Sequence, residues 1–263
     1  MQIVLICIVM LDKAQPPDFL KLLSHDLRWQ ILKALASSDL RVQELVELLR
    51  RSQNLVSYHL QQLRTLGLVH ERRSLVDARE VYYSLDLERM RVLYQSSGEE
   101  LHPALGAPVQ PRFLGGAQLP PARVLFLCTH NSARSQMAEG LLRERSQRQV
   151  EVFSAGSHPS QVHPLAQRIM REMGIDISGQ ASKDLSLFLG QHFDYIITVC
   201  DLARETCPLF PGDPLRIHWS FPDPAAVEGP PESIFQAFKE TAIQLNTRIS
   251  YLMLVIQRNW KQS

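Results

Sequence analysis

The sequence predicts two domains of different class: a mostly helical domain at residues 15–95 and an α/β domain with a parallel sheet at residues 122–258. The chain has 263 residues, which is enough for about two domains of ordinary size. Residues 96–121 are rich in glycine and proline, which favour neither helix nor strand, so we expect a linker there. Apolar residues recur at helical spacing before this linker, whereas strand-like and helix-like segments alternate after it.

Composition excludes several classes of protein. The chain is 45% hydrophobic and 21% charged, as globular proteins are, and no apolar run reaches the roughly 20 residues of a membrane helix. The apolar residues 1–11 lack a basic region and a cleavage site, so we expect no signal peptide and no membrane association. Four cysteines, including Cys7, are too few for a disulfide scaffold and indicate reduced thiols in a cytoplasm. With a net charge of +1, nucleic-acid binding has to be argued from motifs.

The first domain is predicted to consist of helices followed by a β-hairpin. Apolar residues follow helical spacing over residues 19–35 and 42–49. A further helix begins after the N-cap candidate Ser52 and ends at Gly67. Residues 68–85 have β-prone ends around a charged tip, which is typical of a hairpin. This order is that of a winged helix–turn–helix, mostly α with a β-hairpin wing.

Residues 22–32 and 52–69 closely resemble the arsenic-repressor (ArsR-type) family. The resemblance implies a homodimer, formed through this domain, on a palindromic operator DNA. The start of the third helix is expected to be exposed and to read base edges. The residues concerned are Gln53, Asn54, Ser57, Tyr58 and His59, with phosphate contacts expected from Arg64, Arg72, Arg73 and Arg79. For each of them an ordinary solvated surface residue is the alternative interpretation.

The inducer site of arsenic-sensing relatives is expected to be missing. Those relatives carry Cys-Val-Cys in the helix before the recognition helix, whereas this chain has Arg41-Val42-Gln43. As(III) needs thiolate ligands, and the domain has no thiol unless Cys7 folds back onto it. Two hypotheses stay open: the second domain is itself the sensor, or the first domain binds DNA constitutively.

The second domain alternates between strands and helices, which predicts a parallel sheet with helices on both faces. The expected strands are residues 123–127, 150–154 and 195–199, and the expected helices are residues 134–146, 163–173 and 233–256.

Cys128 opens a loop that Arg134 closes, in the pattern C-x5-R. The loop joins a predicted strand to a predicted helix, so its backbone N–H groups are expected to surround a tetrahedral anion. The helix dipole and Arg134 both favour thiolate over thiol, which makes Cys128 a nucleophile. Arg134 can hold two anion oxygens, and Ser135 can donate a hydrogen bond to the thiolate. The other expected oxyanion-binding residues are Thr129, His130, Asn131, Ser132 and Ala133.

Followed by Ser-Gln-Met-Ala-Glu-Gly at residues 135–140, this loop resembles that of the low-molecular-weight tyrosine phosphatase family. The resemblance covers most of the second domain and implies a phosphatase-like fold. That family places its general acid in an Asp-Pro loop late in the domain, which implies this role for Asp223 before Pro224. An ordinary Asp-Pro turn is the alternative interpretation.

Cys200 and Cys207 form a further pair that a phosphatase does not need. If the segment between them is helical, seven residues span about 10.5 Å at ~1.5 Å per residue. A disulfide needs Cα atoms within about 7 Å, so the pair can bridge only if the segment unwinds, which Pro208 favours.

In order and spacing the three cysteines resemble those of thioredoxin-coupled arsenate reductases. The resemblance implies that Cys128 attacks arsenate and that Cys200 attacks the adduct and releases arsenite. Cys207 then forms a disulfide with Cys200, which thioredoxin or a similar thiol reductant reduces. Two inert core cysteines are the alternative interpretation.

Two departures refine this prediction. Ala225-Ala226 follow the Asp-Pro pair where tyrosine phosphatases usually carry an aromatic residue for the substrate ring. Several of these reductases bind potassium, and three of the ligands are matched by Asn131, Glu139 and Ser154. Lys183 replaces the fourth, usually Asp, and its ammonium can take the place of the cation. We therefore expect independence of potassium, no metal and no cofactor.

Three functions follow from these patterns. The first is arsenate reduction joined to operator binding. The second is a tyrosine or small-molecule phosphatase joined to a repressor, against which Cys200 and Cys207 argue. The third is a transcription factor whose second domain only senses an oxyanion; the set of Cys128, Arg134 and Asp223 argues against it.

Overall fold

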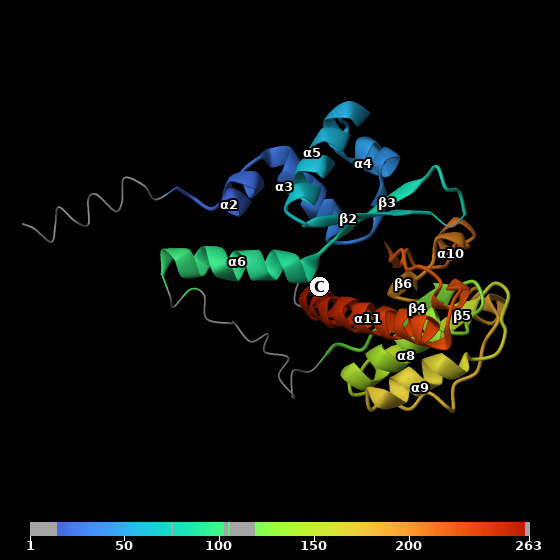
Figure 1. Cartoon of the computed structure of the whole chain (residues 1–263). Coiled ribbons are helices and arrows are strands. Elements are labelled where there is room, and N and C mark those ends of the chain that lie inside the picture. The colour runs from blue at the N-terminus through green and yellow to red at the C-terminus, as the bar shows by residue number, and fades with distance from the viewer. Residues whose placement is uncertain (1–14, 75, 103–104, 106–118, 261–263) are drawn as a thin grey trace, which may run out of the picture. The chain divides into compact units, whose positions relative to one another are not determined.

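The computed structural model of the chain describes residues 15–74, 76–102, 105 and 119–260 (Figure 1). Cys7 lies outside them. Contacts divide the chain into two compact units. The first contains the described residues up to Glu71 and those from Tyr83 to Leu105. The second contains the residues from Leu119 onward together with the segment Arg72–Tyr82.

The first unit has the predicted order of helices and hairpin. Its helices are α2 (Asp18–Leu23), α3 (Asp26–Leu35), α4 (Val42–Leu49), α5 (Gln53–Thr65) and α6 (Leu87–Leu101). Its strands are β1 (Leu40–Arg41) and most of β2 (Val69–Arg73) and β3 (Val81–Leu85), which form a sheet in the order β1-β3-β2. The residues of β2 and β3 that lie between Arg72 and Tyr82 are grouped with the second unit. The winged helix–turn–helix is confirmed.

The core of this unit is made by apolar stripes that recur at helical spacing. Val56, Leu60 and Leu63 on α5 are buried against Ile31 on α3 and Leu45 on α4. Gly67 ends this stretch with a φ of +66°, as predicted, because a residue with a side chain rarely adopts this conformation. Ser52 has the extended backbone of an N-cap, but its side chain makes no capping hydrogen bond.

The helix α6 was not predicted. Asp86 begins it, since its side chain accepts a 2.7 Å hydrogen bond from the N–H of Arg89. Met90 and Leu93 then pack against the core of the unit. The expectation that the linker composition sustains no helix from residue 96 is therefore wrong as far as Leu101. Residues 103, 104 and 106–118 of the predicted linker lie outside the described residues.

The second unit is built on a parallel sheet of four strands. Their order is β5 (Glu151–Gly156), β4 (Arg123–Cys128), β6 (Tyr195–Thr198) and β7 (Leu215–His218). The parallel sheet is confirmed, and β7 is an addition to the predicted strands. The carboxyl ends of the four strands lie at one edge, where Cys128 pairs with Gly156 and Thr198 with His218.

Three longer helices cover this sheet: α8 (Arg134–Arg145), α9 (Pro164–Glu172) and α11 (Pro231–Trp260), which pack against one another (Figure 1). Phe126 and its neighbours in β4 are completely buried, which explains the continuous apolar run of this strand. Two short 3-10 helices are η1 (Leu185–Phe188) and η2 (Pro224–Ala226). No helix in the described part of the chain is long and apolar enough to cross a membrane.

The segment between the paired cysteines differs from the prediction. The helix α10 covers only Asp201–Glu205, with Cys200 as its N-cap residue. Cys207 lies beyond the end of this helix. The helical spacing assumed for the whole segment is therefore wrong, and only a single helical turn separates the two thiols.

Candidate active site

The loop from Cys128 to Arg134 connects the carboxyl end of β4 to the first residue of α8. Cys128 is 3% exposed. Its Sγ accepts a 3.1 Å hydrogen bond from the N–H of Asn131 and lies 2.9 Å from Oγ of Ser135. These two contacts fix the position of the sulfur. The structure thus brings the predicted nucleophile and Ser135 into contact.

The carbonyl groups of this loop point away from its centre. The oxygens of Thr129, His130 and Ser132 accept hydrogen bonds of 2.9, 3.0 and 2.9 Å from the following segment. The donors are the N–H groups of His158, Ser160 and His163. Since C=O and N–H of a trans peptide point in opposite directions, the next N–H groups along the loop face inward. Such a ring of N–H groups at a helix N-terminus suits a tetrahedral oxyanion.

Asn131 holds the loop in this conformation. Its φ of +46° turns the chain, and its completely buried side chain donates to Ser135 and Ser154 at 2.9 and 2.8 Å. The side-chain amide of Gln136 donates hydrogen bonds to the backbone and side-chain oxygens of Asn131, at 3.1 and 2.9 Å. The hydroxyl of Ser182 donates to the same backbone oxygen at 2.6 Å. Sequence reasoning missed Gln136 and Ser182, which lie outside the loop pattern.

Gly156 is a second feature that the sequence did not reveal. A Cβ on this residue would lie 2.5 Å from the backbone oxygen of Thr129 and 2.8 Å from the backbone nitrogen of Asn131. Both distances are shorter than Cβ contacts in proteins, so only glycine allows the loop to approach β5 this closely.

Arg134 and Asp223 meet at this loop. The guanidinium of Arg134 lies 2.8 Å from the Asp223 carboxylate and donates to the backbone oxygen of Phe221 at 3.1 Å. Arg134 is buried, and Asp223 is partly exposed at the start of η2. The structure therefore places the predicted acid beside the arginine of the oxyanion loop. An oxyanion that uses Arg134 has to share or replace this ion pair.

Cys200 also reaches the loop. Its Sγ lies 3.4 Å from Oγ1 of Thr129, and the residue is 4% exposed. Burial raises the pKa of the Cys200 thiol, and the nearby positive charge of Arg134 acts in the opposite direction. A second thiol is thus available beside the residue that follows Cys128.

Cys207 is half-buried, and its neighbour Arg216 was missed by sequence reasoning. Burial raises the pKa of the Cys207 thiol, partly offset by Arg216, whose guanidinium lies 3.7 Å from its Sγ. All three cysteines in the described part of the chain are free thiols.

Lys183 lies beside Glu139, one of the residues that match potassium ligands of the reductases this sequence resembles. Its Nζ lies 3.2 Å from the buried Glu139 carboxylate and 3.0 Å from the backbone oxygen of Ala181. Ser154 donates to the same Glu139 oxygen. An ammonium group already neutralises this carboxylate, so the residues do not suit an additional potassium ion. No group of three or more metal-binding side chains occurs among the described residues.

This arrangement predicts the response to potassium. We expect the wild-type activity to be equal in sodium and potassium buffers of the same ionic strength. In Lys183→Asp, a second carboxylate faces Glu139 and, among the described residues, only Arg143 remains to offset the negative charge, so activity should fall several-fold in sodium and recover when potassium lies between the carboxylates. Steady-state rates in the two buffers measure this, with Lys239→Asp as an exposed control. A wild-type requirement for potassium would contradict the assignment of Lys183.

The predicted base-reading residues do not all lie on the surface. Gln53, Asn54, Ser57 and Tyr58 are exposed at the start of α5. His59 is 3% exposed and packs against His25, with ring centroids 4.4 Å apart. The expectation that His59 is an exposed base-reading residue is therefore wrong. It belongs to the buried stripe that continues with Leu60 and Leu63.

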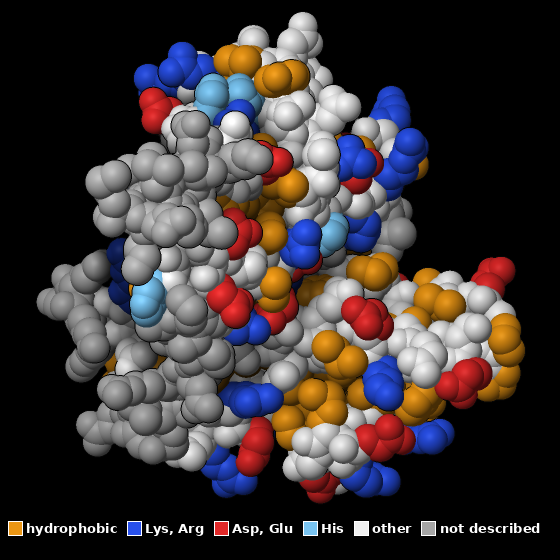
Figure 2. All heavy atoms as spheres, turned by 60° about the vertical axis from the view of Figure 1, so that its left-hand side comes forward, with side chains coloured by type: hydrophobic (Ala, Val, Ile, Leu, Met, Phe, Trp, Pro, Cys, Tyr) orange, Lys and Arg blue, Asp and Glu red, His pale blue; other side chains and the backbone are white. Residues whose placement is uncertain are grey.

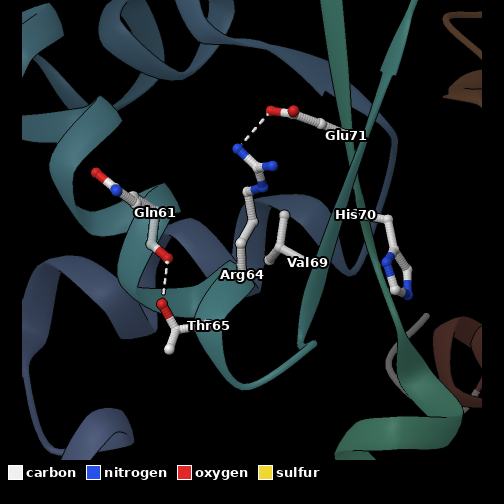
Figure 3. Close-up of a pocket in the computed structure, with 6 residues that line it drawn as sticks. All are labelled: Gln61, Arg64, Thr65, Val69, His70 and Glu71. Carbon is white, nitrogen blue, oxygen red and sulfur yellow. Dashed lines mark hydrogen bonds and ion pairs between the residues drawn. The ribbon is translucent and has the colours of Figure 1, made fainter.

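Three of the four arginine residues predicted to contact DNA phosphates form an ion pair within the protein. Arg64 lies 2.6 Å from Glu71, across a hollow whose wall also includes Gln61, Thr65, Val69 and His70 (Figure 3). Arg79 pairs with Asp77 at 2.8 Å, and Arg72 pairs with Asp201 at 2.6 Å. Arg73 is exposed. Figure 2 shows basic and acidic side chains interspersed on the face it presents, in agreement with the low net charge.

Comparison with known proteins agrees with the two units. Residues 123–262 match the family described as low molecular weight phosphotyrosine protein phosphatase, and residues 25–71 match the bacterial regulatory proteins of the arsR family. An arsenate reductase of Shouchella clausii is 40% identical over 126 residues, which cover 48% of this chain and 91% of the relative. An arsenate reductase of Bacillus subtilis is 36% identical over the same shares. A solved arsenate reductase in oxidized state is 31% identical and covers 51% of this chain and 98% of its own, with a TM-score of 0.45.

Proposed function

Because the chain belongs to the low molecular weight phosphotyrosine protein phosphatase family, we propose that its second unit is an enzyme that reduces arsenate to arsenite. The observation that carries this proposal is the Cys200 thiol, 3.4 Å from the hydroxyl of Thr129 in the oxyanion loop. Hydrolysis of a phosphate ester needs one nucleophilic thiol, whereas reduction of arsenate by thiols needs two. The relatives named arsenate reductase support the same choice.

The first step is the binding and capture of arsenate. The inward N–H groups of residues 129–134 and the Arg134 guanidinium hold its oxygens. The Cys128 thiolate attacks arsenic, a sulfur–arsenic bond forms, and a hydroxide leaves. Asp223 gives this hydroxide a proton, so that water departs. Ser135, which lies 2.9 Å from the Cys128 sulfur, stabilises the thiolate before the attack.

The second step transfers the electrons. The Cys200 thiolate attacks the Cys128 sulfur, a disulfide forms, and the electron pair of the sulfur–arsenic bond goes to arsenic. Arsenic leaves as arsenite, reduced from As(V) to As(III) by two electrons from two thiolates. The Cys207 thiolate then attacks the Cys200 sulfur and releases the Cys128 thiolate, which leaves a Cys200–Cys207 disulfide.

The reductant is a dithiol protein, thioredoxin or a similar carrier. Cys128 and Cys200 are 3% and 4% exposed, so a protein reductant has no access to a disulfide between them. Cys207 is more exposed and lies beyond the end of a short helix. Moving the disulfide to Cys207 offers the carrier a sulfur that is less buried than those of Cys128 and Cys200, and two electrons from the carrier restore both thiols. This cycle works in a reducing compartment, so we place the chain in the cytoplasm.

The first unit is an ArsR-family helix–turn–helix. We propose that the chain forms a homodimer through this unit and that the homodimer binds operator DNA. The proposed base readers are the exposed residues Gln53, Asn54, Ser57 and Tyr58 of α5. Among the described residues of this unit there is no cysteine, which supports the loss of the thiol inducer site at residues 41–43. The proposed sensor is then the second unit, where arsenate, arsenite or the oxidation state of Cys128, Cys200 and Cys207 alters the affinity for DNA. Arsenite titration of operator binding, in wild type and Cys200→Ser, tests it; identical responses would rule it out.

The test of the reductase is a coupled assay with thioredoxin, thioredoxin reductase and NADPH. Consumption of NADPH that depends on arsenate is the expected result. Hydrolysis of para-nitrophenyl phosphate is measured alongside. Ester hydrolysis without arsenate turnover, and without an effect of Cys207→Ser, would show the alternative function of a phosphatase. Arsenate binding without turnover would support the remaining alternative, a transcription factor whose second domain only senses an oxyanion.

The cycle should depend on pH through Cys207. Burial raises the pKa of this thiol, so the thiol form dominates at neutral pH, and the reactive thiolate increases as the pH rises. We expect the rate of Cys200–Cys207 formation to rise about tenfold per pH unit below that pKa. Removing the positive charge in Arg216→Gln should move this profile to higher pH, whereas Arg171→Gln should not. Rapid-quench thiol trapping at several pH values measures the step; identical profiles would contradict a role for Arg216.

A further inference from the structure

A second cluster of buried polar residues lies beside the redox pair, and the proposed reaction does not yet use it. It consists of Thr198, Asp201, His218 and Ser220, each at most 8% exposed. Thr198 and His218 are paired at the ends of β6 and β7, and Oγ1 of Thr198 lies 2.8 Å from Nδ1 of His218. Four polar side chains in an apolar core are costly unless they bond one another.

Asp201 is the centre of this cluster. Its carboxylate accepts a 2.6 Å hydrogen bond from the Ser220 hydroxyl and lies 3.4 Å from Nε2 of His218. Arg72, which belongs to the same compact unit, donates to both carboxylate oxygens at 2.6 and 2.7 Å. Nε of Arg72 also donates to the backbone oxygen of Ser220 at 3.0 Å. This is the forked geometry in which arginine binds carboxylates most firmly.

These bonds keep Asp201 charged. Burial alone would raise its pKa, but hydrogen bonds from His218, Ser220 and Arg72 outweigh burial and hold the pKa well below its usual range. Removing one partner leaves this buried charge with less compensation, which is unfavourable. Asp201 is therefore a fixed point of the chain, and the cluster resists its displacement.

The position of this fixed point matters because Asp201 directly follows Cys200 and begins α10. On one side, the anchored residue keeps the Cys200 sulfur beside Thr129 of the oxyanion loop. On the other side, α10 ends at Glu205, and Cys207 lies beyond it, where its backbone N–H makes one long hydrogen bond of 3.4 Å to the Arg204 oxygen. Formation of the Cys200–Cys207 disulfide then requires the Cys207 end of the segment to move while the Cys200 end stays.

We propose that Asp201, with Arg72, His218 and Ser220, is a positioning site that holds Cys200 in place for its attack on the Cys128–arsenic adduct. The inference rests on the proposed reductase function and adds a residue from the predicted DNA-contact set, Arg72, to its machinery. The attack forms the Cys128–Cys200 disulfide and expels arsenite, and its rate depends on how closely the two sulfurs are held. The Arg72 guanidinium cannot bind Asp201 and a DNA phosphate in the same fork, so these two roles exclude each other.

The test measures this single step in the full-length chain with Cys207→Ser as background, so that the cycle stops at the Cys128–Cys200 disulfide. Acid quenching after mixing with arsenate, followed by mass spectrometry, gives the rate of disulfide formation. We expect Arg72→Gln and Asp201→Asn to slow it about tenfold or more, with the arsenate concentration for half-maximal rate unchanged. Arg72→Lys should recover part of the rate, and the exposed neighbour Arg73→Gln is the matched control.

The outcomes separate the two proposals. Absence of an arsenate-dependent Cys128–Cys200 disulfide in the background chain itself would overturn the reductase and this inference together. A normal background rate with equal rates in Arg72→Gln and Arg73→Gln would overturn the positioning site alone. A higher arsenate concentration for half-maximal rate in Arg72→Gln would also overturn it, since the defect would then lie in arsenate binding by the oxyanion loop. Arg72→Gln is decisive even if Asp201→Asn does not fold.

Discussion

Cys200→Ser and Cys207→Ser are each expected to abolish continuous arsenate reduction, by about a thousandfold or more, but at different points of the cycle. Without the Cys200 thiolate nothing attacks the sulfur–arsenic adduct, so no arsenite is released. Without Cys207 the first disulfide still forms, and each protein molecule releases a single arsenite. That disulfide then stays between two residues that are 3% and 4% exposed, out of reach of a protein reductant. Arsenite measured in a single turnover, beside steady-state NADPH consumption, distinguishes the two variants.

The control is Cys7→Ser, a cysteine-to-serine change outside the relay, which should keep full activity. Mass spectrometry of the Cys207→Ser protein after one turnover should show Cys128 linked to Cys200. Steady turnover by Cys207→Ser at the wild-type rate would contradict the three-thiol relay. Release of arsenite by Cys200→Ser would show that a different thiol, or the external reductant, attacks the adduct.

The centre of the active site could be predicted because its parts are local in the sequence. Cys128 and Arg134 belong to a single loop, and the strand before it and the helix after it are clear from their composition. The hydrogen bonds that shape the loop come from elsewhere. Ser182 and Gly156 are brought to Asn131 only by the order of the sheet, which no local pattern encodes.

Two errors have different causes. The helix α6 was missed because its second half, with Ser96, Ser97 and Gly98, has low helix propensity, and packing of Met90 and Leu93 on the core outweighs this preference. His59 was placed on the surface because of its residue type. Its position three residues after Val56 places it in the buried stripe of α5, so the helical periodicity alone predicts that His59 is buried.

Gly156→Ala is expected to lower kcat/KM for arsenate about a hundredfold or more, although the residue touches no substrate. The added methyl group would lie 2.5 Å from the Thr129 oxygen and 2.8 Å from the Asn131 nitrogen, which are both backbone atoms. Neither can move alone. Thr129 O accepts a 2.9 Å hydrogen bond from His158, and the Asn131 N–H donates to the Cys128 sulfur at 3.1 Å. Relief of the clash therefore displaces the N–H groups that hold the oxyanion and stabilise the thiolate.

Gly179→Ala is the matched control, since a Cβ there meets no atom within 4 Å and its φ is not in the left-handed region. Activity of both variants is compared after circular dichroism has shown that the sheet and helices are retained. Iodoacetamide alkylation of Cys128 gives an independent measure, because a displaced Asn131 N–H no longer stabilises the thiolate, and alkylation at neutral pH should slow. Wild-type activity in Gly156→Ala would mean that the loop can retreat from β5 without losing its shape, and that the oxyanion is held mainly by Arg134.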